Sequence, residues 1–134
     1  MVVDWNSFRE SIEDTFYNEI INIYEVSQVE DAFGAVIGNT LKPFVAEKKC
    51  NIQNSNRDIT KKEFGMDIDS KYRVSLSNDI NLDAKKKYIA TLESSIKNID
   101  SSIQYEVVSI QPFNTYVLLF LKEQSDAYEV GDGT

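Results

Sequence analysis

The sequence predicts a mainly β fold: a small antiparallel β-barrel with an N-terminal amphipathic helix and a long inter-strand loop. Several short segments alternate apolar and polar residues with the period of two that a half-buried strand requires. Turn-forming residues separate these segments, and one segment has the spacing of a helix. Short strands joined by turns favour a closed sheet, because closure leaves no exposed strand edge.

The chain has 134 residues, the usual length of one domain. We expect a single domain over residues 1–123, with a helix over 4–20 and the barrel over 21–123, and then a flexible acidic tail over 124–134. The helix is indicated by apolar side chains at steps of three and four, namely Trp5, Phe8, Ile12, Phe16 and Ile20. Such a helix packs on the core or docks on a partner, and its sequence fits both.

After this helix the pattern changes to strands. We expect strands over residues 21–26, 43–53, 72–77, 87–93, 103–110 and 114–122. The stretch from Gly34 to Gly38 predicts a turn-rich excursion between the first two strands. In the last strand, residues 116–121 are apolar on both faces, which predicts the most buried strand of the sheet.

A long connection is expected over residues 54–70, with a helical turn over 58–64. Loops longer than about 12–15 residues are uncommon in compact domains unless they are functional or disordered. This connection is therefore a candidate working surface.

Residue usage argues against catalysis and against a cofactor. The chain has no histidine, the usual general base and commonest metal ligand, and it has one cysteine, Cys50. The sequence contains neither the glycine-rich dinucleotide-binding motif nor a P-loop. A lone thiol fits synthesis in a reducing cytoplasm, and we expect no membrane partner because the apolar runs are short. A small hydrolase that works without histidine stays a distant alternative.

The best metal candidate is Asp67 and Asp69, with Asp79 and Asp83 further along the chain, because carboxylates two residues apart can converge on a hard cation. The match to a calcium loop is poor, and solvated acids explain the pattern more simply. We therefore expect no metal.

Nucleic-acid binding is a second alternative. Lysine clusters occur at residues 48–49, 61–62 and 85–87, and Tyr72, Arg73 and Tyr88 could form the stacking face of an OB-like module. The net charge of −8 opposes this hypothesis, because phosphate repels an acidic protein.

Taken in order, six segments resemble small phage head–tail connector proteins of the head-completion or stopper type. The segments are the strand over 21–26, the turn Asp31-Ala32-Phe33-Gly34, the strand over 49–53, the element over 59–66 and the closing pair of strands over 105–110 and 116–121. The element over 59–66, which ends in Phe64, Gly65 and Met66 before the strand at Tyr72, is the most suggestive.

The resemblance implies a non-enzymatic virion protein of the phage neck, made in the host cytoplasm. Such a protein assembles as a ring between the portal or adaptor and the tail, seals packaged DNA and touches it in passing in the channel. Stopper, adaptor and tail-terminator or tail-completion roles all fit. The candidate assembly surface comprises Lys61, Lys62, Phe64, Met66, Lys85, Lys86 and Lys87.

Overall fold

The computed structural model describes residues 18–94, 97 and 99–124 of the chain. Within these residues the fold is mainly β, with six strands and one helix. The strands are β1 (Glu19–Glu30), β2 (Val36–Asn54), β3 (Tyr72–Ser77), β4 (Tyr88–Glu93), β5 (Tyr105–Pro112) and β6 (Tyr116–Glu123), and the helix α2 (Arg57–Phe64) lies between β2 and β3.

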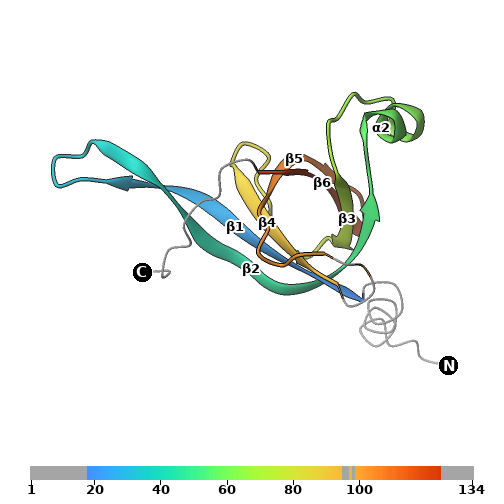
Figure 1. The fold of residues 1–134 in the computed structure, drawn as a ribbon, viewed down its shortest axis with the longest axis horizontal. Helices are drawn as coiled ribbons and strands as arrows, with labels where there is room; N and C mark the ends of the chain where they lie inside the picture. The colour runs from blue at the N-terminus through green and yellow to red at the C-terminus, as the bar shows by residue number, and fades with distance from the viewer. Residues whose placement is uncertain (1–17, 95–96, 98, 125–134) are drawn as a thin grey trace.

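All neighbouring strands are antiparallel, and the sheet closes into a ring in the order β1-β2-β3-β6-β5-β4, with β4 pairing back to β1 (Figure 1). The prediction of a mainly β, antiparallel fold is confirmed. The β4–β5 seam is the shortest, with Ile89 opposite Glu106 and Ala90 opposite Tyr105.

Two predicted segments lie wholly or largely outside the described residues, namely the helix over 4–20 and the tail over 124–134. The predicted helix end is wrong where it can be compared, because Glu19 and Ile20 already belong to β1. Both pair with β2, and Ile20 also pairs with Glu93 of β4.

The core fills the inside of the ring. Alternate side chains point inward along each strand, as the pleat requires. The buried cluster comprises Ile21, Ile23, Cys50, Ile52, Val74, Leu76, Tyr88, Ala90, Leu92, Tyr105, Val117, Leu119 and Leu121. Burial of Cys50 raises the pKa of its thiol, which makes it a packing group rather than a nucleophile.

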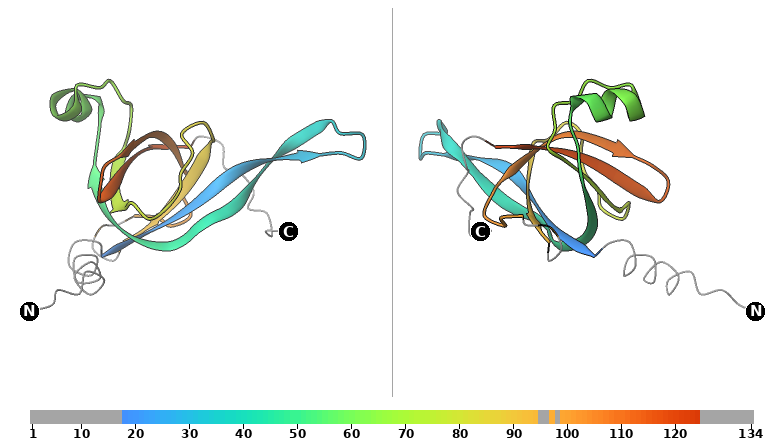
Figure 2. Two further views of the ribbon diagram at one scale, coloured as in Figure 1. Left: turned by 180° about the vertical axis from the view of Figure 1, so that it is seen from behind. Right: turned by 45° about the vertical axis from the view of Figure 1, so that its right-hand side comes forward.

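Strands β1 and β2 continue beyond the ring as a two-stranded arm, residues 26–41, which projects away from the closed sheet (Figures 1 and 2). The arm arises because β1 pairs with β4 only over Ile20–Glu25, whereas β1 and β2 stay paired as far as Glu30 and Val36. The predicted turn-rich excursion is wrong in extent: the turn is confined to residues 31–35, and Gly38 lies within β2.

A β-bulge lies within the ring, where β1 pairs with both β2 and β4. The register of β1 and β2 shifts between Ile21 and Ile23, and the backbone N–H of Glu47 donates to Oδ1 of Asn22 at 2.8 Å. Glu47 has a φ of 52°, in the left-handed region. The bulge bends β2 locally and increases the twist of the strand.

The connection between β2 and β3 contains less irregular backbone than predicted, because eight of its residues form α2. The predicted helical turn over 58–64 is confirmed, with the helix starting one residue earlier. Strand β3 begins and ends at the predicted residues, and β4, β5 and β6 differ from the expected bounds by one or two residues.

Candidate functional site

Helix α2 is fixed at both ends by its own sequence. The side chain of Asn56 accepts a hydrogen bond from the N–H of Ile59 at 2.9 Å, which caps the helix N-terminus. Gly65 ends the helix with a φ of 67°, and its N–H donates to the carbonyl of Lys61. These caps hold a short helix that would be marginal alone.

Buried hydroxyl groups tie the rest of the connection to this helix. The hydroxyl of Thr60 donates to the carbonyl of Arg57 at 3.0 Å and lies 3.3 Å from both the N–H and the carbonyl of Ile68. Ser70 donates to Ser55 at 2.9 Å, across the base of the connection. The whole β2–β3 connection is therefore one ordered unit.

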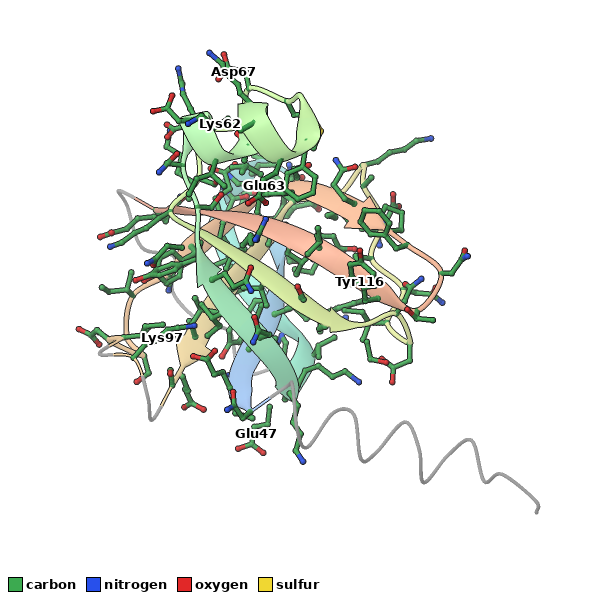
Figure 3. All side chains as sticks on the ribbon, turned by 90° about the vertical axis from the view of Figure 1, so that its right-hand side faces the viewer. Glu47, Lys62, Glu63, Asp67, Lys97 and Tyr116 are labelled. Atoms are coloured by element: carbon green, nitrogen blue, oxygen red, sulfur yellow. The ribbon has the colours of Figure 1, made fainter. Side chains whose placement is uncertain are left out.

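Aromatic and ionic contacts attach α2 to the outer face of the sheet. The ring of Phe64 packs edge to face on Phe120 of β6, with centroids 5.6 Å apart. The guanidinium of Arg73 lies 5.6 Å from the Phe64 ring centroid, donates to Gln53 at 2.8 Å and pairs with Glu63. Figure 3 shows Glu63 between α2 and the sheet. The predicted burial of β6 on both faces follows, because α2 covers Phe120 from outside.

Beside α2, the outer face of β2, β3 and β6 holds a groove of about 480 Å³, called here the α2 groove. Its apolar part comes from Phe64, Tyr116 and Leu118, and polar side chains line the remainder. The polar lining comprises Asn51, Gln53, Arg73 and Ser75. Tyr116 lies on the same face of the sheet as Glu63 in Figure 3. A concave surface that combines apolar side chains with a few polar groups is a common form of binding site.

The residues of the predicted assembly surface fall into two groups. Lys61 and Lys62 are exposed on α2, Phe64 is half-buried against the sheet, and Met66 follows the helix C-cap. The three lysines over 85–87 are exposed in the β3–β4 connection, at the base of the arm.

Lys86 pairs with Glu25 of β1 at 3.3 Å, and the carbonyl of Lys87 accepts from Val26 N–H at 3.1 Å. The Glu25 carboxylate raises the pKa of Lys86. These contacts anchor the lysine loop to β1, whereas α2 is anchored to β6. The two predicted groups therefore belong to different surfaces.

The arm ends in a turn whose shape is set by Asp31. Its carboxylate Oδ1 accepts the N–H groups of Phe33 at 2.8 Å and of Ala35 at 2.9 Å, and its own N–H donates to the Ala35 carbonyl. Gly34 supplies the positive φ of 83° that the turn needs. Phe33 is left 96% exposed, the most exposed large apolar side chain of the described residues.

The acids considered for a metal site are instead paired with cations or used in a turn. Asp67 and Asp69 lie 3.8 and 3.9 Å from Arg57, and Asp69 also lies 3.2 Å from Lys122. Asp79 pairs with Lys48 at 2.8 Å. Among residues 18–94, 97 and 99–124, no three metal-ligating side chains gather at one point.

The tyrosines considered for base stacking face the core. Tyr88 is 2% exposed, and its hydroxyl accepts the N–H of Asp83 at 2.9 Å. Tyr72 packs edge to face on Tyr105 with centroids 5.6 Å apart. The Tyr88 ring is therefore buried, and the Tyr72 ring is half-buried against the core.

A buried carboxylate lies at the start of β1. Glu19 is 3% exposed, and its Oε1 accepts the N–H of Ile52 at 3.0 Å and Nζ of Lys97 at 3.1 Å. Burial raises the pKa of Glu19, but hydrogen bonds from Ser94, Ile52 and Lys97 outweigh it, so the pKa lies below its ordinary value. Glu19 therefore joins β1 to β2 through Ile52 and to the β4–β5 connection through Lys97. These contacts stabilise the ring.

Sequence reasoning recognised the turn at Asp31 but missed the arm and the α2 groove. The sequence signal for the arm was Phe33, an aromatic residue between turn-forming residues. A side chain at the tip of a projecting turn does not reach the core. The groove had no local signal, since its lining comes from β2, α2, β3 and β6.

No protein-family model and no curated protein sequence matches the chain. Within the described part of the chain, no helix has the length and apolar character needed to cross a membrane.

Proposed function

We propose that this chain is a structural protein of a phage virion, a subunit of the head–tail connector. In this proposal its copies form a ring between the portal or adaptor and the tail, and the ring seals packaged DNA. The closed sheet acts as a small barrel that holds the contact surfaces in place.

One observation carries the proposal: a single closed sheet displays two well-ordered projections on different sides. The arm presents Phe33 on a turn fixed by Asp31, and the β2–β3 connection presents α2 fixed by its caps and by Phe64. A subunit that must touch neighbours on both sides needs two such surfaces. The segments on which the resemblance to connector proteins was drawn lie in β1, the Asp31 turn, β2, α2, β5 and β6.

Loss of the chain from the phage that encodes it tests this proposal. We expect particles made with a stop codon in the gene to be heads that lose their DNA and lack tails, with free tails in the lysate. Tailed particles that retain DNA would contradict the proposal. Filled heads beside tails of abnormal length would instead favour the tail-terminator alternative.

A further inference from the structure

We propose that two copies of the free protein pair along the exposed edge of β1 in the arm. The two strands run antiparallel about a two-fold axis, and Val29 of one copy lies opposite Val29 of the second copy. The acidic tip of each arm then lies beside the lysines at the base of the other arm. This inference goes beyond the proposed function, because it concerns the chain before it joins a virion.

The outer edge of β1 is open along the arm. On this side β1 pairs with β4 only as far as Glu25, and the N–H of Val26 then donates to the carbonyl of Lys87 at 3.1 Å. From Ser27 to Glu30, no strand of the described residues pairs with this edge, although β2 still pairs with the other edge. The arm projects clear of the ring in Figures 1 and 2. An open edge exposes backbone N–H and C=O groups in strand geometry, and the occupant that matches it is another strand.

Of the two edges of the arm, that of β1 is the regular one. Wherever the register of β1 and β2 shifts, the extra residue belongs to β2, so the bulges interrupt the edge of β2. Lys42 and Pro43 also lie in β2, and both a charge and a missing N–H hinder strand addition. Residues 27–29 of β1 contain neither a charge nor a proline. A second strand therefore adds to β1.

The backbone of β1 fixes the register of the pairing. In an antiparallel strand, alternate residues direct their N–H and C=O groups to the same side. Because the N–H of Val26 points toward Lys87, the backbone groups of Gln28 and Glu30 also point to the open side. Val26 is already bonded, so Gln28 of each copy pairs with Glu30 of the other. Val29 is 38% exposed in the single chain, and it meets its counterpart on the two-fold axis, where both side chains lose apolar surface to the contact.

The charges along the edge favour a second copy as the added strand. Residues 27–41 include Glu30 and Asp31 and no base, so the tip of the arm is acidic. The other end of the open edge is bordered by the lysines over 85–87, all of them exposed. An antiparallel copy brings its acidic tip beside these lysines, and the two-fold axis repeats the contact.

Lys87 and Glu30 of the second copy carry this complementarity. Lys87 lies opposite Val26, and in the proposed register Glu30 of the second copy lies opposite Gln28. These two positions are on the same face of the sheet and about 7 Å apart along the edge, a distance that two long side chains can span. The complementary charges thus lie at the contact itself.

Disulfide formation at position 29 tests the pairing. The full-length Val29→Cys protein is kept at about 1 mM in an oxidising glutathione buffer, so that a weak contact is populated. We expect a disulfide-linked dimer, because the Cα atoms of such a pair lie about 4.5 Å apart and disulfides need about 4.4–6.8 Å. Cys50 is buried and does not compete. Non-reducing electrophoresis and mass spectrometry identify the link.

Gln28→Cys is the matched control on the same exposed edge. In the proposed register the two copies of position 28 are offset by two residues, about 8 Å apart and beyond the reach of a disulfide. We expect this variant to link at least about ten-fold more slowly than Val29→Cys. Equal rates for the two variants, or no link at position 29, would overturn the pairing. The second of these results is also the one expected if β1 pairs with β2 of another copy.

Charge exchange in the Val29→Cys protein tests the choice of a second copy. Glu30→Lys and Lys87→Glu should each slow the linking about two- to five-fold, as expected for an exposed ion pair, and the double exchange should restore the rate. Lys62→Glu, an equal change of charge on α2, should not restore the Glu30→Lys protein. Failure of the double exchange to recover, or recovery with Lys62→Glu, would contradict the proposal.

Discussion

The ring of Phe64 meets the ring of Phe120 edge to face, with centroids 5.6 Å apart and planes inclined by 81°. Phe120 pairs in register with Arg73 of β3, and Arg73 in turn lies over Phe64. These three side chains hold α2 on the outer face of the closed sheet. The presentation of the α2 groove therefore depends on the same packing that stabilises the fold.

Replacement of Phe120 by alanine should lower the free energy of unfolding by about 3–5 kcal/mol, the range for emptying a buried aromatic site. Phe120 is 0% exposed, and both the sheet and α2 surround it. Urea denaturation measures the change. Phe33→Ala is the matched control and should shift stability by no more than about 0.5 kcal/mol, because that side chain is exposed. A near-neutral Phe120→Ala protein would mean that α2 and β6 do not pack as described.

Replacement of Glu47 by glycine should raise the free energy of unfolding by about 0.5–1 kcal/mol. Glu47 adopts a φ of 52°, which is unfavourable for a residue with a Cβ and free of steric cost for glycine. Its backbone N–H bond to Asn22 does not depend on the side chain. Thermal melts of Glu47→Gly and of Glu47→Ala separate the backbone effect from the loss of charge. Equal melting temperatures for the two variants would refute this explanation.

The stabilisation from Glu19 should disappear in acid. Because the pKa of Glu19 is lowered in the fold, its contribution is complete above the pKa of an unfolded glutamate, about 4.3, and is lost as pH falls through the lower folded value. Glu19→Gln should cost about 1–3 kcal/mol at pH 7, since the amide weakens the bonds to Ile52 and Lys97. Urea denaturation of both proteins between pH 7 and pH 2 should show the gap closing below pH 4, whereas a gap independent of pH would argue against the pair.

The free protein should not bind single-stranded DNA. Its net charge is −8, and the tyrosines that could stack on bases lie in the core or at its rim. Fluorescence anisotropy at low salt, followed through a salt series, measures this. A dissociation constant whose logarithm changes linearly with the logarithm of salt concentration would revive the OB-like alternative.

Local patterns predicted the strands well and long-range features poorly. Strand β3 was predicted at its exact bounds because its alternation is regular and turns flank it. The length of β2 was missed because Gly38 and Pro43 resemble strand breakers. Pro43 is tolerated because β2 pairs with β3 only over Cys50–Asn54, so at Pro43 no hydrogen bond to β3 is needed.

Local sequence patterns could not predict the start of β1 or the α2 groove, and the reasons differ. Ile20, Ile21 and Ile23 satisfy both a helical and a strand period, so tertiary pairing with β2 and β4 decides the structure there. The groove exists only once α2 has packed on β6. Among the predicted surface residues, Phe64 proved to line that groove, whereas Lys85, Lys86 and Lys87 belong to the base of the arm.

The most direct test of the central claim is a cryo-electron reconstruction of the neck of the virion that encodes this chain. The account predicts a closed ring of copies of this closed sheet between head and tail. A neck whose rings are all built from other proteins, with no density for this closed sheet, would contradict it.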